Sequence, residues 1–518
     1  MEDLFCQYKT LCKSIRVSFK NCGYNLRPRA EAGLWVVPLI PTALLVSTLK
    51  QIFAGGQASL SHVYFATTVV SCGVLVTTIL YLMRFLPKLG HRIHNAYLGV
   101  PAVGTLLFLL ITQNVYSHNF HDFERENTWF RKSCGLSRTA HILTGFILSI
   151  LGGVMSSYGV LAGLPTLLTL APSCFTIGEA VVVVHCLIIF VYSSAVNLCH
   201  VAFSHVPLLA EMDISQETSY DISTVILQVG MLSVLLMLGV LVASPETREP
   251  YLFYVVLSLA VLTTVVCLHL LLGGSPFIWI VLNITRDQGT FNIFLWWIIC
   301  SIAATVSVHR QVRWEQKAST SQRKLFHLLA VVVFGLGILN VPDLIYLASG
   351  VCFAIFLVLE AARILQIPPL SDILKNGFIL YGDEKDILIA LTPLYLLAGM
   401  AAPLWLSPLG NIPIEAAHLM PYLSGLLSIG VGDTAASYIG SNFGSTKWPG
   451  TNRTVEGTIA CFTSQLAVTL LLIFFDYLPG DILSLFRNVV AIGATSMIES
   501  RTDQVDNMVL PLVHFILT

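Results

Sequence analysis

The stretch 251–273, YLFYVVLSLAVLTTVVCLHLLLG, decides the fold class of this chain. It contains no Asp, Glu, Lys or Arg, and a helix of this length spans the roughly 30 Å hydrocarbon layer of a bilayer. Similar apolar runs recur along the 518 residues, which are 55% hydrophobic and only 11% charged. The runs are continuous and do not alternate with polar residues, so they predict helices and not a barrel. The sequence therefore predicts an all-α, polytopic transmembrane helix bundle without a large soluble domain.

These runs predict about 13–15 membrane spans, since each needs about 20 apolar residues. A last run, 507–518, is short for a crossing of its own. The expected spans are 34–53, 63–83, 95–115, 141–164, 176–203, 222–243, 251–273, 291–309, 325–340, 343–365, 387–407, 418–440, 456–478 and 482–498.

The basic residues predict the orientation of the bundle, because Lys and Arg concentrate on the cytoplasmic side. The segment 1–33 is basic, and counting spans from it places the basic loops 84–94 and 310–324 on the same side. The acidic loop 204–221 falls on the opposite side, and the slightly basic loop 116–140 is the exception there. We therefore expect a cytoplasmic N-terminus and no cleavable signal sequence.

Charged residues are distributed unevenly along the chain and suggest three regions. The basic segment 1–33 precedes an N-terminal transmembrane scaffold over 34–309, whose loops are short. From residue 310 onward charged residues appear at span edges and inside loops. We therefore expect a C-terminal transmembrane catalytic region over 310–518, with a nucleotide-binding loop at 428–458.

That loop, SIGVGDTAASYIGSNFGSTKWPGTNRTVEGT, is the most glycine-rich and polar stretch of the chain. Asp433 lies at a span edge, where a carboxylate is unfavourable unless it faces a partner, water or a metal. Glycine turns can present backbone amides to an anion, and Lys447 and Arg453 add positive charge. This combination is typical of a nucleoside triphosphate site with Mg²⁺, although no Walker pattern occurs. The alternative is a glycine-rich loop that allows close helix packing.

Three further clusters are candidates for chemistry. Arg323 or Lys324 can share a helix face with His327 at a membrane edge, or can serve as a simple cytoplasmic anchor. Glu360 and Arg363 either neutralise each other or orient a basic residue on phosphate. The acidic stretch 499–507 falls on the same predicted side as the glycine-rich loop. Its Glu499 and Asp503 are either metal ligands or bases, or part of a solvated loop.

The sequence resembles the dolichol kinases. Arg453 stands where the family usually has Lys before Thr-x-Glu-Gly, which keeps the charge and changes the geometry. The matching motifs are GVGDTxASxxGSxxG at 430–444, WPGT at 448–451, RTxEGT at 453–458, RKLFHL at 323–328, FLVLE at 356–360, TDQVDNMVLPL at 502–512 and CFTIGEA at 174–180.

The resemblance implies transfer of the γ-phosphate of CTP to the hydroxyl of dolichol. The expected setting is the endoplasmic reticulum membrane, with the active site facing the cytoplasm and dolichyl phosphate as a product for protein glycosylation. Mg²⁺ or another divalent cation would be the cofactor, held by Asp433, Glu456 and Glu499. The expected catalytic residues are Asp433, Glu456, Arg323, His327 and Asp503. The expected nucleotide-binding residues are Gly430, Gly432, Thr434, Ser437, Gly440, Ser441, Gly444, Lys447, Arg453, Thr454 and Gly457.

Three alternatives stay open at the level of sequence. A CTP-dependent kinase of another lipid alcohol, such as diacylglycerol or phytol, shares the same core motif. A lipid cytidylyltransferase would attack the α-phosphate instead, and a transporter would also have many spans with an interrupted helix. The expected partners are CTP, a polyprenol and the bilayer, with no nucleic acid, and the sequence predicts no oligomeric state.

Overall fold

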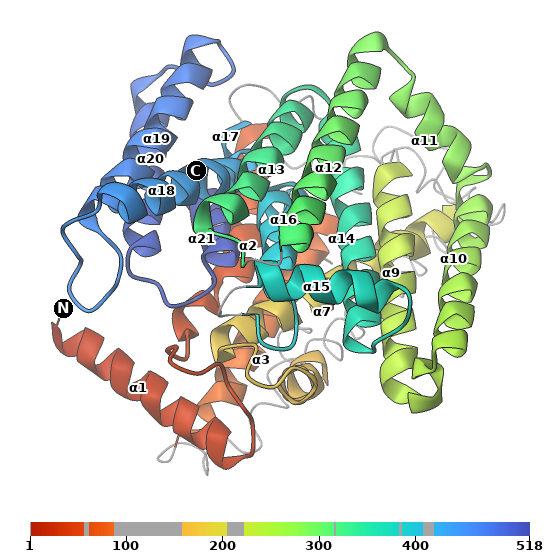
Figure 1. The fold of residues 1–518 in the computed structure, drawn as a ribbon, viewed down its shortest axis with the longest axis horizontal. Helices are drawn as coiled ribbons and strands as arrows, with labels where there is room; N and C mark the ends of the chain where they lie inside the picture. Colours follow the sequence, from red (N-terminus) through yellow and green to blue (C-terminus); the bar gives the residue numbers. More distant parts are fainter. Residues whose placement is uncertain are drawn as a thin grey trace, which may run out of the picture. The chain divides into compact units, whose positions relative to one another are not determined.

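The computed structural model describes residues 2–55, 62–86, 158–204, 222–314, 317–382, 386–407 and 419–518 as helices joined by short connections (Figure 1). The predicted span 95–115, most of span 141–164, loop 116–140 and nearly all of loop 204–221 lie outside these residues. Within the described residues there is no strand, and one isolated bridge joins Lys447 to Thr454. The all-α prediction is confirmed.

Nine of the described helices are long and apolar enough to cross a membrane, and four shorter apolar helices accompany them. Helix α10 (Pro250–Leu272), which contains most of the opening stretch, leaves Leu259, Val261 and Leu262 more than half exposed, as a lipid-facing helix does. The predicted polytopic membrane bundle is therefore confirmed.

Contacts divide the chain into two units, Met1–Thr218 and Ser219–Thr518. In the first unit, helices α2 and α3 pack on α7. The interior of this unit contains an ion pair between two buried residues, in which Arg27 Nη2 lies 2.7 Å from Glu179 Oε1. The described elements are α1 (Glu2–Asn21), η1 (Leu34–Val36), α2 (Leu39–Gly55), α3 (His62–Met83) and α7 (Ile177–Ser204).

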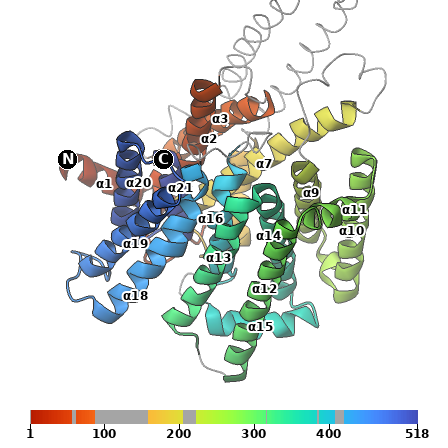
Figure 2. The ribbon, with the colours of Figure 1, turned by 90° about the horizontal axis from the view of Figure 1, so that it is seen from above.

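The second unit contains every residue of the candidate site. Its main core includes Trp297, Phe334, Met400 and Leu427, from four separate elements. Figure 2 shows the ribbon of this unit with most of its helices labelled. Besides α10, the described elements are α9 (Ile222–Ala243), η4 (Pro245–Arg248), α11 (Pro276–Ile284), α12 (Gln288–Trp314), α13 (Thr320–Asn340), α14 (Pro342–Ile364), α15 (Leu370–Tyr381), α16 (Leu391–Trp405), α17 (Leu419–Tyr422), η6 (Leu426–Asp433), α18 (Thr434–Phe443), α19 (Val455–Phe474), α20 (Ile482–Glu499) and α21 (Asp506–Leu517).

The predicted span 418–440 is broken into three pieces, α17, η6 and α18. The middle piece, η6, is a π-helix, a rare element that is common at functional sites. The predicted loop 428–458 is therefore wrong in its first half, because residues 428–443 are helical and only 444–454 form a loop. Small residues are tolerated in these helices because they let neighbouring backbones approach closely.

Candidate active site

Asp433 is the last residue of η6 and is 3% exposed. Its Oδ2 atom forms an ion pair with Lys324 Nζ and lies 3.7 Å from His327 Nε2. Lys324 and His327 are three residues apart and therefore share one face of α13. The first turn of this helix is fixed by a capping box, in which Ser319 accepts from the Gln322 backbone N–H and Gln322 accepts from the Ser319 N–H.

Sequence reasoning selected Arg323 for the basic role beside His327, whereas the contact with Asp433 is made by its neighbour Lys324. The i, i+3 spacing from Lys324 to His327 was the available signal. Motif matching alone could not choose between two adjacent basic residues.

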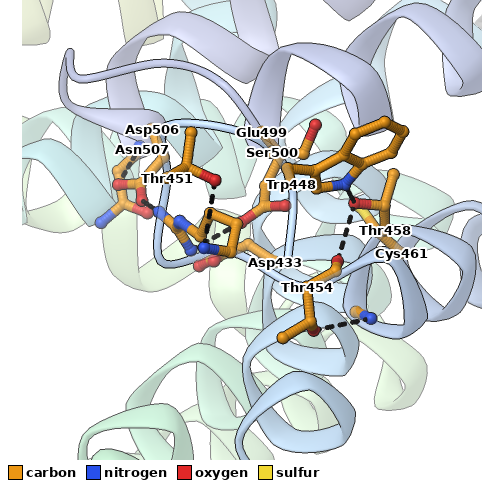
Figure 3. Close-up of polar contacts among 12 residues, drawn as sticks. Asp433, Trp448, Thr451, Thr454, Thr458, Cys461, Glu499, Ser500, Asp506 and Asn507 are labelled. Atoms are coloured by element: carbon orange, nitrogen blue, oxygen red, sulfur yellow. Dashed lines mark hydrogen bonds and ion pairs between the residues drawn. The ribbon is translucent and has the colours of Figure 1, made fainter. Parts of the chain in front are cut away.

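Arg453, in the loop before α19, lies between the carboxylates of Glu499 and Asp506. Figure 3 shows these two acids in one group of polar residues with Asp433. Its Nη1 atom is 2.6 Å from Glu499 Oε1 at the end of α20, and its Nη2 atom is 3.4 Å from Asp506 Oδ2 at the start of α21. Burial opposes the positive charge of this arginine. The carboxylates of Glu499, Asp506 and Asp433 outweigh that effect and raise the pKa of the guanidinium. Arg453 is therefore a permanent cation among three carboxylates.

The structure brings Asp506 into this group of charges, whereas sequence reasoning selected Asp503. Asp503 is exposed, whereas Asp506 is partly buried and pairs with Arg453. Glu499, predicted as a metal ligand, is only 2% exposed and lies in the same group.

Glu456 contacts the loop. Its Oε1 atom accepts hydrogen bonds from Ser445 Oγ at 2.7 Å and from the Thr446 backbone N–H at 3.0 Å. The hydrogen bonds described for Glu456 therefore brace residues 445–446. They do not join it to Asp433, Glu499 and Asp506, so its predicted metal role gains no support from its contacts.

The loop 444–454 is a narrow hairpin. The Trp448 N–H donates to Arg453 O at 3.0 Å and the Val455 N–H donates to Thr446 O at 2.8 Å. Its tip is a tight turn in which the Thr451 N–H donates to Trp448 O at 3.2 Å and Gly450 has φ of 77°. Proline followed by glycine at the two central positions is the pattern of a type II turn. The turn therefore holds Arg453 on a short extended segment that is hydrogen-bonded to the opposite arm of the hairpin.

The predicted phosphate-binding glycines mostly serve helix packing. A Cβ atom at Gly457 would lie 2.9 Å from Ala436 O and 3.3 Å from Gly440 Cα, so α18 and α19 cross closely at this point. Gly430 and Gly432 lie inside η6, Gly440 lies inside α18, and the amides of all three belong to helical segments. The predicted turn at Gly440 is therefore wrong, whereas Gly430 and Gly432 allow the close approach of neighbouring side chains that their small size predicts.

The remaining predicted nucleotide contacts lie on both sides of the hairpin. Thr434, Ser437 and Ser441 are in α18, Gly444 and the exposed Lys447 are in the loop, and Thr454 caps α19 by accepting from the Gly457 N–H at 3.2 Å. Their roles toward a nucleotide stay predictions.

The residues around Asp433 fit a divalent cation bound together with phosphate. The Thr434 hydroxyl is buried without a hydrogen-bond partner among the described residues and directly follows Asp433. No group of three His, Cys, Asp or Glu side chains in the described parts of the chain is arranged to hold a metal alone. Mg²⁺ commonly uses one or two carboxylates and completes its shell with water and substrate phosphates.

Glu360 and Arg363 brace three segments of the bundle. They form an ion pair of 2.7 Å on α14. Arg363 Nη2 also donates to Leu388 O at 2.5 Å, and its guanidinium lies 3.8 Å from the ring centre of Phe378 on α15. Glu360 Oε1 accepts from the Ala390 N–H at 2.6 Å. These contacts favour the structural interpretation of the pair.

Comparison with known proteins gives one consistent family. The sequence model of the family "Dolichol kinase" matches residues 160–381. The chain is 32% identical over 371 residues to a dolichol kinase of Homo sapiens and 31% identical over 367 residues to one of Mus musculus. Each alignment covers 68% of this chain and 66% of the relative, just under two thirds of its length.

A dolichol kinase of Arabidopsis thaliana is 33% identical over 247 residues, which is 46% of this chain and 42% of that protein. No solved structure matches the chain. The Gly-Asp and Arg-Thr-x-Glu-Gly motifs, the membrane bundle and the relatives agree, and the chain belongs to the dolichol kinase family.

Proposed function

We propose that this protein is a CTP-dependent dolichol kinase that supplies dolichyl phosphate for protein glycosylation at the endoplasmic reticulum membrane. The observation that carries the proposal is that two cation–carboxylate groups, each built on a buried acid, lie close to one another. Lys324 pairs with Asp433, and Arg453 pairs with Glu499 and Asp506. Kinases need mainly positioned charge around the transferred phosphoryl group, and this arrangement provides both signs of charge.

The site lies where helix ends meet. Lys324 is in the second turn of α13, Glu499 ends α20, and Asp506 begins α21. The loop with Arg453 directly precedes α19. Because α13, α19 and α20 are long enough to span a bilayer, their ends lie at its surface. A membrane-dissolved alcohol and a water-soluble nucleotide can meet at such a position, and the positive-inside pattern supports the cytoplasmic face.

The proposed reaction follows from these charges. Lys324 and Arg453 exchange their carboxylate partners for phosphate oxygens of CTP, which are also negatively charged hydrogen-bond acceptors. Asp433 and Glu499 would hold Mg²⁺ together with water and phosphate oxygens, and the ion would neutralise charge on the phosphate that is transferred. The dolichol hydroxyl oxygen forms a bond to the γ-phosphorus while the bond from that phosphorus to the β-phosphate oxygen breaks. CDP leaves, and a carboxylate of the group takes the hydroxyl proton.

Purified protein with γ-labelled CTP and a panel of lipid alcohols tests this proposal. We expect the label to enter dolichol. Label released as pyrophosphate would support a cytidylyltransferase, and preferential labelling of diacylglycerol or phytol would assign another acceptor. Flux of dolichol without consumption of CTP would support a transporter and contradict the proposal.

A further inference from the structure

Gly432, the residue before Asp433, lies against a buried glutamine of α19. A Cβ atom at Gly432 would be 2.5 Å from Gln465 Nε2 and 3.0 Å from Cys461 Sγ. Both distances are shorter than a carbon at this position tolerates without movement of its neighbours. The last turn of η6 therefore packs directly against the Gln465 side-chain amide.

The Gln465 side chain has a fixed orientation. It is fully buried, and its Nε2 atom donates to Cys461 O at 3.1 Å. Nε2 also lies 3.4 Å from Ser496 Oγ, whose single hydroxyl proton is donated to Ile492 O at 2.8 Å. Ser496 can therefore only accept from Gln465, and the amide nitrogen must face both α19 and α20.

This amide thus contacts both elements whose ends carry the two carboxylates that the proposed reaction needs. On one side it contacts Gly432, which directly precedes Asp433. On the other side it bonds to Ser496, one helical turn before Glu499 on α20. A rigid side chain in contact with both elements sets how far apart their ends are held.

We propose that Gln465 is a positioning residue that sets the separation of the Asp433 and Glu499 carboxylates. The inference rests on the proposed kinase function and deepens it, because Gln465 acts only through these two acids. A misplacement of about 1 Å in a reacting group can cost about 100-fold in rate. Shortening Gln465 should therefore change turnover and the requirement for Mg²⁺ more than the binding of substrates.

A double-mutant cycle between Gly432 and Gln465 tests the proposal. Gly432→Ala should lower kcat by about 100-fold, because its methyl group collides with the amide. Gln465→Ala should lower kcat by about tenfold and raise the Mg²⁺ concentration for half-maximal activity, with the KM for dolichol unchanged. In the double variant the methyl group occupies the vacated space, so kcat should exceed that of Gly432→Ala alone.

Gly430→Ala is the matched control. Its Cβ would meet Val331 and Met400, on the other side of η6, so Gln465→Ala should not restore its activity. Rescue of both alanine variants, or strictly additive losses, would overturn the inference. If Gly432→Ala does not yield folded protein by size-exclusion chromatography, Gln465→Met replaces it. A rise in the KM for dolichol without a change in kcat or Mg²⁺ requirement would then contradict the positioning role.

Different results would refute the proposed kinase function and the positioning role of Gln465. A wild-type protein that transfers no label from CTP to dolichol would refute the proposed function. A wild-type protein that is active, with independent effects at Gly432 and Gln465, would refute only the positioning role.

Discussion

Asp433 can remain buried because Lys324 supplies the opposite charge from a different helix. A buried carboxylate without such a partner is strongly unfavourable, so the two residues depend on each other. The Lys324 ammonium is a compact charge at the end of a flexible side chain. It can therefore bind a phosphate oxygen when the Asp433 carboxylate binds another cation. At the residue scale, the pair is both a structural contact and a cation held ready for an anionic ligand.

Asp433→Asn tests this role. We expect expression to be retained and phosphotransfer to fall by at least about 100-fold, because the amide removes a charge that faces the reacting groups. The measurement is kcat/KM with labelled CTP on monodisperse protein. Asp372→Asn, at an exposed position of α15, is the control and should keep full activity. Substantial activity in Asp433→Asn would remove this residue from the site.

Arg453 requires its forked guanidinium to reach Glu499 and Asp506 together. Arg453→Lys keeps the charge but can satisfy one carboxylate at a time, so we expect a loss of about 5- to 20-fold in kcat/KM for CTP. Arg453→Gln removes the charge and should cost at least about 100-fold. Kinetics over a series of CTP concentrations compare the two variants. Equal losses in both would mean that charge at this position is unimportant.

At the scale of elements, the hairpin 444–454 carries Arg453 toward the ends of α20 and α21. Gly450 adopts φ of 77° at its tip, which L-residues with a side chain rarely adopt. Gly450→Ala should therefore strain the turn by about 1 kcal/mol and raise the KM for CTP several-fold with little change in kcat.

Gly274→Ala is the matched control for the hairpin. An added Cβ there meets open space, and no positive φ is required, so its KM for CTP should not change. A Gly450→Ala variant with wild-type KM would show that the tip of the hairpin does not affect nucleotide binding.

The brace formed by Glu360 and Arg363 connects α14, α15 and the segment 388–390. Arg363→Ala should lower the melting temperature, because it leaves the half-buried Glu360 carboxylate with one partner fewer. The KM for CTP should stay close to wild type. Thermal unfolding in detergent together with steady-state kinetics measures both. A large rise in KM with unchanged melting temperature would instead favour a role in orienting phosphate.

At the scale of the whole molecule, the orientation of the chain decides whether the site can use cytoplasmic CTP. An acceptor sequence for N-glycosylation inserted after Gly450 should remain unmodified in microsomes. The same insertion in the segment 205–221 should be glycosylated, because it is predicted to face the lumen. Gel mobility before and after glycosidase treatment reports the result, and a glycan after Gly450 would contradict the proposed topology.

The sequence alone determined the membrane bundle, the positions of most helices and the motifs of the family. These features depend on local composition, since a backbone in lipid must satisfy its hydrogen bonds within each helix. The same reasoning had no local signal for the contacts between distant residues. It selected Arg323 and Asp503, whereas the described ion pairs join Lys324 to Asp433 and Asp506 to Arg453, and it placed a turn at Gly440, which lies in a helix.

Only the tertiary structure decided which charges meet. Lys324 and Asp433 are separated by 109 positions in the chain, and Arg453 reaches Asp506 across 53 positions. Such pairs are set by the packing of α13, η6 and α21, and by the local widening of η6 into a π-helix. Side-chain contacts of this kind depend on the relative positions of packed elements, and for that reason no local sequence pattern could specify them.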